Sequence, residues 1–271
     1  MIPLRDNIPS RTAPVINYAM IAACTLVFLA QLADQADGDA ELVERLGMIP
    51  ARVVQPDERI ERSERVAVVD RSGRVVQVVE RSRELAAAPV HPWLTLLTCI
   101  FLHGGWMHFL GNMWFLFIFG DNVEDRIGHV GYLLFYLLSG VAASGAHLLS
   151  DPSSQVPTIG ASGAIASVMG AYCLLYPRAQ VVSLIPIIVI IQIVVLPAPI
   201  FLGIWFALQF FQGLGSITSL QATGVAWWAH IGGFAVGFLA AAALRAFGET
   251  RPPVETRRPH TERIAMYRYR S

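Results

Sequence analysis

The chain has 271 residues, of which 54% are hydrophobic and 15% charged, and its mean hydropathy is +0.51. Several apolar runs are long enough to cross a hydrocarbon core of about 30 Å, which takes about 20 helical residues, so an ordinary soluble domain is excluded. The formal net charge is zero and every basic residue is an arginine. We predict an all-α membrane protein of several spans, and we expect no nucleic-acid partner.

The N-terminal segment, residues 1–14, is polar, and the first apolar run follows at residues 15–33. A run in this position is either a cleaved signal peptide or a retained first span. We favour a retained span, because the run is long for a signal sequence and no small-x-small cleavage site follows it.

Residues 34–93 form a charged insertion that holds more than half of the acidic residues of the chain. We predict that this insertion is exposed to water. Within it, two valine-rich stretches in residues 66–79 flank the turn sequence Asp70-Arg71-Ser72-Gly73, a pattern that predicts a β-hairpin. The flanking stretches 38–47 and 57–65 are either helical or disordered, and the pattern does not decide between these alternatives.

Residues 94–247 form the predicted core, with five further apolar runs at 94–119, 130–149, 160–176, 186–211 and 225–247. Three prolines, Pro186, Pro197 and Pro199, interrupt the fourth of these runs. We therefore expect a re-entrant or interfacial piece that leads into a span at about 199–213. This gives six spans in the whole chain. Counting the interrupted run twice gives seven, and we favour six.

Arginines in the short loops and tails predict the orientation. The opposite short loops, residues 150–158 and 213–224, carry no basic residue. We therefore predict that both termini are cytoplasmic, including the arginine-rich tail 248–271, and that the insertion lies outside the cell (plasma or inner) membrane. Seven spans would move the tail to the outside. The basic residues that fall on one side of the six-span topology are Arg5, Arg11, Arg126, Arg178 and those of the tail.

Polar residues open alternate spans of this topology. His108 and Asn112 lie near the start of the second span, Ser162 at the start of the fourth and His230 near the start of the sixth. Because all three spans begin at the outer face, these side chains are expected to lie at one shallow depth. Polar side chains are costly in a bilayer and usually face the interior of a bundle or a water-filled cavity.

Ser162 and His230 supply the minimum for nucleophilic catalysis, a hydroxyl and an imidazole that can take its proton. No carboxylate lies within the apolar runs to orient the histidine, so the sequence indicates a dyad rather than a triad. His108 and Asn112, four residues apart, share a helical face and can donate hydrogen bonds to an oxyanion. His103 lies off that face, and we assign it a supporting role at the start of the helix.

Glycines next to these residues predict close helix packing. Gly160 and Gly163 flank Ser162, and Gly233 and Gly237 form a small-xxx-small pair after His230. Such residues let two membrane helices approach closely, although a serine among them is by itself more often structural than catalytic. The convergence of Ser162 with several histidines favours the catalytic interpretation.

Other kinds of site are less consistent with the sequence. The chain has no His-Glu-x-x-His motif, and an aspartyl mechanism would need two carboxylates within the membrane, so we expect no metal and no cofactor. The cysteines each lie in an apolar run, where a thiol behaves as a small hydrophobe, and we predict no disulfide among Cys24, Cys99 and Cys173.

These motifs together resemble the rhomboid family of intramembrane serine proteases. The resemblance implies Ser162 as nucleophile, His230 as base, and His108 and Asn112 as oxyanion donors. It also implies that the substrates are single-pass or other membrane-anchored proteins, cut near the outer face at a small residue. The matching motifs are His103 to Asn112, Glu124-x-Arg126-x-Gly128 with Glu124 and Arg126 as structural residues of the inner loop, Gly160-x-Ser162-Gly163, and Ala229-His230-x-x-Gly233-x-x-x-Gly237.

Two positions depart from the family pattern. Trp93 lacks the arginine that often follows it, and position 166 is alanine where members often carry an aromatic that stacks on the histidine. Another group must then hold His230. The main alternative is a proteolytically inactive member that binds and escorts membrane helices, which is disfavoured because Ser162 and His230 are both present. A channel or transporter would need polar residues that continue toward the inner face.

Overall fold

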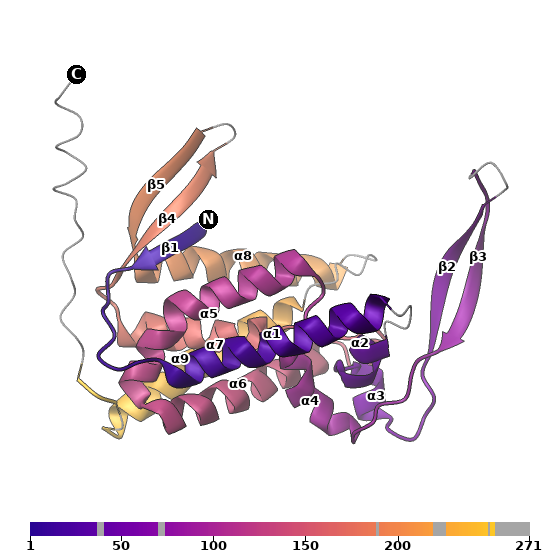
Figure 1. Ribbon diagram of the computed structural model, residues 1–271, viewed down its shortest axis with the longest axis horizontal. Coiled ribbons are helices and arrows are strands. Elements are labelled where there is room, and N and C mark those ends of the chain that lie inside the picture. Colours follow the sequence, from indigo (N-terminus) through magenta and orange to yellow (C-terminus); the bar gives the residue numbers. More distant parts are fainter. Residues whose placement is uncertain (37–40, 70–73, 188–189, 219–225, 249, 253–271) are drawn as a thin grey trace.

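The computed structural model describes residues 1–36, 41–69, 74–187, 190–218, 226–248 and 250–252. Long helices run side by side through the molecule and form a single bundle (Figure 1). This arrangement confirms the predicted all-α membrane fold. The bundle helices are α1 (Val15–Ala36), α5 (Trp106–Ile127), α6 (His129–Ser150), α7 (Ser162–Leu175), α8 (Ala198–Thr218) and α9 (Trp227–Ala246).

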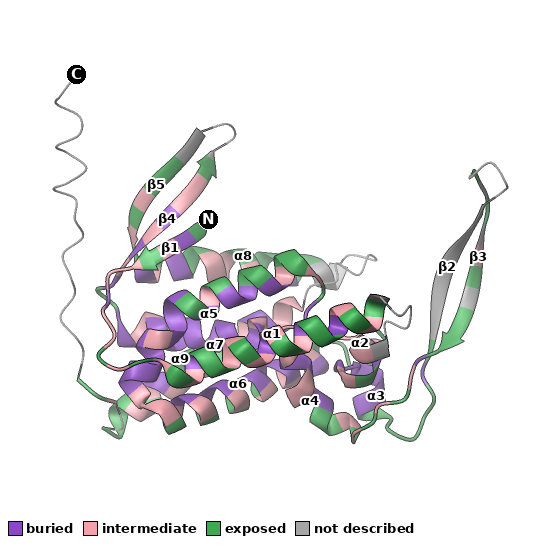
Figure 2. Ribbon diagram, in the orientation of Figure 1, coloured by how far each residue is buried: buried purple, intermediate pink, exposed green. Residues whose placement is uncertain are grey.

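Length and hydropathy identify the spans. Among the described residues, α1, α6, α8 and α9 are long and apolar enough to cross a membrane, and α5 with the short helices before it makes a fifth candidate. Helix α7 is apolar but has only 14 residues, 11 of them buried. Because the other helices surround α7 (Figure 2), it needs little contact with lipid. The count of six spans therefore stays a prediction.

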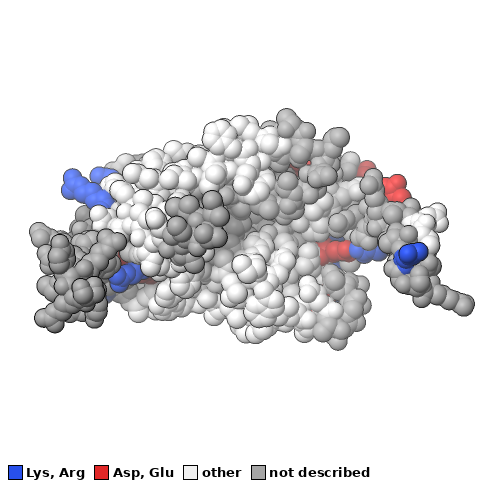
Figure 3. Space-filling view, turned by 90° about the horizontal axis from the view of Figure 1, so that it is seen from above, with Lys and Arg blue, Asp and Glu red and all other residues white. Residues whose placement is uncertain are grey.

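Charged side chains lie away from the middle of the bundle. In Figure 3 the coloured arginine, aspartate and glutamate side chains of the described residues gather toward the two ends of the molecule, and the middle of the visible face is white. An apolar belt between two charged ends is what a bilayer requires of a protein that crosses it. The chain is therefore a multi-pass membrane protein.

The two ends of the bundle are distinct (Figure 1). The terminal end carries the N-terminal strand β1 (Ile2–Asp6) and the end of α9, and the insertion end carries α2 (Glu41–Leu46) and α3 (Pro50–Val54). Helices α5, α7 and α9 all begin at the insertion end. The three helices that carry the predicted site residues therefore enter the bundle from the same side.

The second predicted span is broken. Residues 92–101 form short helical turns, including α4 (Thr95–Thr98), and meet α5 at an angle of 80°. Two glycines cause the break: Gly104 precedes Gly105, which has φ +132°, a conformation that glycine adopts without a Cβ clash. Helix α5 then continues to Ile127, beyond the predicted end of the run at residue 119, so Asp121 lies on the helix.

The insertion contains the predicted hairpin, in a longer form. Strands β2 (Glu61–Val69) and β3 (Val75–Glu84) pair antiparallel, with Val66 opposite Val79. For residues 61–65, the expectation of helix or disorder is wrong, because strand β2 begins at Glu61. In the other flank, residues 41–46 are helical, and the predicted turn at 70–73 lies outside the described residues.

A second sheet at the terminal end is unexpected. Strands β4 (Gln180–Ile187) and β5 (Ile190–Pro197) form an antiparallel hairpin, and β1 pairs with β4. The predicted re-entrant or interfacial piece is therefore a β-hairpin, and the N-terminal segment that precedes α1 contributes a strand. Valine and isoleucine dominate both strands of the hairpin, and these β-branched residues favour strands.

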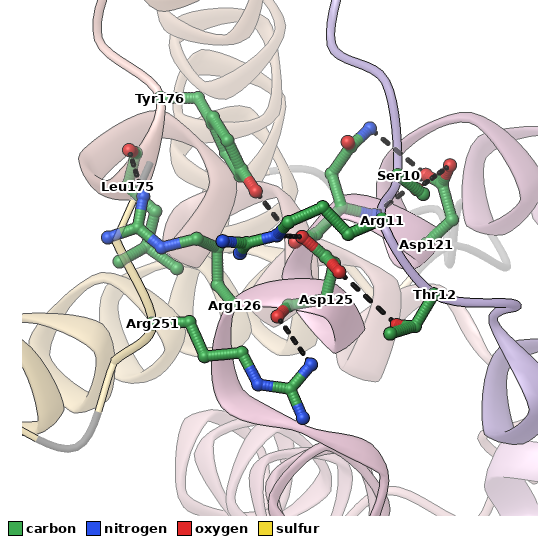
Figure 4. Close-up of polar contacts among 10 residues, drawn as sticks. Ser10, Arg11, Thr12, Asp121, Asp125, Arg126, Leu175, Tyr176 and Arg251 are labelled. Atoms are coloured by element: carbon green, nitrogen blue, oxygen red, sulfur yellow. Dashed lines mark hydrogen bonds and ion pairs between the residues drawn. The ribbon is translucent and has the colours of Figure 1, made fainter. Parts of the chain in front are cut away.

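Polar contacts tie the N-terminal segment to the last turns of α5 (Figure 4). Arg11 Nε donates to Asp125 Oδ2 at 2.8 Å, and the Ser10 hydroxyl donates to Asp121 at 2.8 Å. Arg126 donates to the carbonyl of Leu175 at the end of α7, at 3.1 Å. These contacts connect the N-terminus, α5 and α7 at the terminal end of the bundle.

Glu124 supports the start of the first helix. Its carboxylate accepts the backbone N–H groups of Ile16 and Asn17, at 3.0 and 2.8 Å, in the first turn of α1. The first N–H groups of a helix have no intrahelical acceptor, so a carboxylate placed there satisfies them and favours the helix dipole. Glu124 and Arg126 thus make structural contacts, on a helix rather than on a loop, and they lie at the end of the bundle opposite the predicted site.

Candidate functional site

Ser162 stands at the first position of α7, directly after a tight turn. Gly160, two residues earlier, has φ +127°, and a Cβ built there would lie 2.7 Å from His108 Nε2. Only glycine suits this backbone. Because Ser162 begins the helix, its backbone N–H has no intrahelical acceptor and lies at the positive end of the helix dipole.

His230 lies in the first turn of α9 and contacts the serine directly. Its Nε2 is 2.7 Å from Ser162 Oγ, within hydrogen-bond distance. The imidazole is buried, with 9% of the residue exposed, so water has little access to this contact. The two residues are 68 positions apart in the chain and come from different helices.

Glycines allow α7 and α9 to approach this closely. A Cβ on Gly233 would overlap the carbonyl oxygen of Gly163, and one on Gly237 would overlap the carbonyl oxygen of Ser167. A Cβ on Gly163 would lie 2.8 Å from the Ala143 Cβ of α6. Side chains at these positions would push the helices apart, and the Ser162–His230 contact depends on the approach.

Three side chains hold the ring of His230. Gln209 Oε1 of α8 lies 2.6 Å from His230 Nδ1. Trp205 and Trp227 each lie with a ring centroid 6.0 Å from that of His230, at interplanar angles of 41° and 88°. Sequence reasoning missed these roles, although the alanine at position 166 indicated that some other group must hold the ring. A glutamine within an otherwise apolar helix was the available signal.

His108 is oriented by the turn before its helix. The backbone N–H of Gly104 donates to His108 Nδ1 at 3.2 Å. Because a neutral imidazole carries one proton, an accepting Nδ1 leaves Nε2 as the donor. This Nε2 faces Gly160 and the start of α7.

Asn112 lies one turn further along α5, where 8% of the residue is exposed. Its Nδ2 finds no hydrogen-bond acceptor within the described part of the chain. A buried amide donor without an acceptor is costly, and such groups commonly mark a site that receives a ligand. Asn112 therefore offers a donor to whatever enters the neighbouring cavity.

His103 has a different environment from the other two histidines. Its backbone is clamped by Gln31 of α1, which accepts from the His103 N–H at 2.9 Å and donates to the His103 carbonyl at 3.1 Å. The ring packs edge-on against Phe28, Phe109 and His108. His103 thus lies beside the site, at the break before α5, and does not line the cavity.

A cavity of about 470 Å³ joins these groups. Its apolar wall includes Phe115, Ile165, Met169 and Trp205, and no carboxylate or thiol of the described residues lines it. The chemistry available there is therefore that of a hydroxyl, two imidazoles and two amides. The polar lining residues are His108, Asn112, Ser162, Gln209 and His230.

The chain is similar in sequence to known rhomboid proteins. The family model described as Rhomboid domain matches residues 90–247. "Rhomboid protease GluP" of Bacillus subtilis (strain 168) is 36% identical over 154 residues, which are 56% of this chain and 26% of that protein. "Putative rhomboid protease YdcA" of the same organism is 36% identical over 80 residues, or 30% of this chain and 40% of that protein.

A plant protein shows a similar but shorter match. "Rhomboid-like protein 11, chloroplastic" of Arabidopsis thaliana is 41% identical over 73 residues, which are 27% of this chain and 26% of that protein. In each of these three comparisons, the chain covers less than half of the relative's own length.

Proposed function

Because the chain belongs to the rhomboid family, we propose that it is an intramembrane serine protease in which Ser162 is the nucleophile and His230 the general base. The observation that carries this proposal is the 2.7 Å contact between Ser162 Oγ and His230 Nε2 at a cavity within the bundle. A serine hydroxyl is a weak nucleophile, and a hydrogen-bonded imidazole activates it by accepting its proton.

The proposed reaction has two steps, formation of an acyl-enzyme and its hydrolysis. As Ser162 Oγ attacks the scissile carbonyl, its proton passes to His230 Nε2, and the carbonyl oxygen becomes an oxyanion. His230 then gives this proton to the leaving amine, the C–N bond breaks, and an acyl-enzyme remains. Water attacks the ester with His230 again as base, which releases the new carboxylate and restores the serine.

Three donors are available to stabilise the oxyanion: the backbone N–H of Ser162, the Nε2–H of His108 and the Nδ2–H of Asn112. The first lies at the start of α7, where a helix offers no intrahelical acceptor, and the last has no acceptor within the described residues. Donors that are fixed before the reaction lower the barrier, because they need no reorganisation when charge develops. The three come from residues of α5 and α7 that line the cavity.

Loss of one oxyanion donor should slow the reaction without stopping it. Replacing Asn112 with alanine should lower kcat by about 10- to 1,000-fold without abolishing the reaction, because the other two donors remain. KM for the same substrate should change little, since the bond forms only as the oxyanion develops. Steady-state kinetics of purified wild type and Asn112→Ala in vesicles measures both. A wild-type kcat for Asn112→Ala would remove this residue from the oxyanion site.

We also propose how the chain crosses the membrane and which class of substrate it cleaves. Arginine placement supports six spans, cytoplasmic termini and a site near the outer face of the cell membrane. The substrates are then membrane-anchored proteins whose chain can reach the cavity between α5, α7, α8 and α9. No carboxylate among the described residues lines the cavity, and the proposed steps need no metal.

The test is the release of fragments from a transmembrane substrate. Wild type and Ser162→Ala are reconstituted into vesicles with a membrane-anchored substrate, and fragments are identified by mass spectrometry. We expect cleavage by wild type alone, at a bond near the outer leaflet, with no loss of activity in a metal chelator. A protein that only binds and escorts membrane helices would yield no fragments with either form. Activity that is lost in the chelator and returns with zinc would contradict the serine mechanism.

A further inference from the structure

We propose that Gln209 is a positioning residue of this site, whose side-chain carbonyl holds His230 in the tautomer that can accept the serine proton. The proposal deepens the function proposed above and rests on it. It adds a third member, supplied by α8, to the dyad of Ser162 and His230 that the sequence indicated.

Both ring nitrogens of His230 have a partner. Gln209 Oε1 lies 2.6 Å from Nδ1, and Ser162 Oγ lies 2.7 Å from Nε2. A carbonyl oxygen can only accept a hydrogen bond, and a neutral imidazole has a single N–H. Nδ1 must therefore carry the proton, which leaves Nε2 as the acceptor for the serine hydroxyl. With the opposite tautomer the serine would keep its proton.

Two side chains on one face of α8 contact the His230 ring. Trp205 and Gln209 are four residues apart and so share one face of α8, and both contact His230. From α9, Trp227 meets the ring edge-on. On α7, the residue one turn after the serine is Ala166, which is fully buried and too small to stack on the imidazole. The ring is therefore oriented from the α8 side.

An amide suits this position better than a carboxylate in physical terms. A carboxylate would stabilise the imidazolium more strongly, but an ionised acid buried within the membrane region is costly. The neutral amide of Gln209 supplies the acceptor without that charge. It lines the same cavity as Ser162 and His230, so it lies at the reaction site rather than behind it.

The test compares three variants in vesicles. Gln209→Leu keeps the size of the side chain but removes the acceptor, and should lower kcat by about 10²- to 10³-fold with KM nearly unchanged, less than the roughly 10⁴-fold cost of losing the proper acceptor in a serine triad. Gln209→Glu keeps an acceptor and should retain most of the activity. Its added charge favours the imidazolium, so the acidic limb of the kcat/KM profile should move to higher pH.

The matched control is Gln212→Leu, which makes the same substitution at an exposed position three residues further along α8. It should behave as wild type. A wild-type kcat for Gln209→Leu, or an unmoved acidic limb for Gln209→Glu, would overturn the assignment of Gln209. If Gln209→Leu fails to fold, as judged by thermal unfolding, the pH profile of Gln209→Glu decides alone.

Failure of this inference is distinguishable from failure of the proposed function. If wild type cleaves and Ser162→Ala does not, while both Gln209 variants match wild type, the protease stands and the role of Gln209 falls. If wild type releases no fragments from any membrane-anchored substrate, the proposed function falls, and the positioning role falls with it.

Discussion

Replacing His230 with alanine is expected to lower the rate of substrate cleavage by about 10⁴- to 10⁶-fold, close to the loss for Ser162→Ala. The reason lies in the single contact of 2.7 Å between the two side chains. Without the imidazole, the serine keeps its proton near neutral pH and the leaving amine has no acid. Because the two residues act as a unit, the double variant should be little worse than either single one.

The measurement is the initial rate of fragment release from a fluorescent transmembrane substrate in vesicles. His91→Ala is the matched control, since His91 is an exposed histidine that does not line the cavity, and it should cleave at the wild-type rate. Circular dichroism and the Tm should show that His230→Ala remains folded. Cleavage by His230→Ala within about tenfold of wild type would rule out general-base catalysis by this residue.

The second large effect is expected from one added methyl group at Gly237. In Gly237→Ala the new Cβ would overlap the carbonyl oxygen of Ser167, which is backbone and cannot rotate away. Helices α7 and α9 must separate to relieve this overlap, at a cost of about 1–3 kcal/mol or more in the free energy of unfolding. Since the serine and the histidine belong to these two helices, a shift of about 1 Å should also lower kcat by about 100-fold.

Gly203→Ala on α8 makes the same substitution where a Cβ would meet no atom of the described residues within 4 Å beyond its own helix backbone. Alanine favours a helix over glycine by about 1 kcal/mol, so this control should keep or raise the Tm and leave cleavage unchanged. The Tm and the cleavage rate of both variants in one detergent provide the comparison. Equal behaviour of the two variants would mean that the close approach of α7 and α9 does not govern the site.

The helical bundle was predictable because a bilayer imposes a simple rule on sequence. Apolar runs must be about 20 residues long, and their bounds at residues 15–33, 130–149 and 225–247 lie within three residues of α1, α6 and α9. Because successive spans cross the membrane in opposite directions, Ser162, His230 and His108 are then expected at one end of the bundle. Their depth in the bundle was therefore predictable, whereas the distances between them were not.

The remaining features depend on contacts that hydropathy does not encode. The sequence of residues 180–197 contains no charged residue and is typical of a membrane segment, yet residues 180–187 and 190–197 form strands that pair with each other, and β1 pairs with the first of them. The last turns of α5 extend past the predicted run and carry Asp121, whose carboxylate accepts hydrogen bonds from Ser10 and Asn122. Gln209 was only a weak signal, because each of the two glutamines in the otherwise apolar helix α8 is compatible with many roles.

We propose Ser162 as the reactive hydroxyl of the chain and His230 as the base that activates it. Both roles can be measured in one experiment, in which the protein in vesicles reacts with a fluorophosphonate and the adduct is located by peptide mass spectrometry. We expect one adduct, on Ser162, which forms at least about 10³-fold more slowly in His230→Ala. An adduct on any other residue, or equal rates of labelling with and without the His230 imidazole, would contradict it.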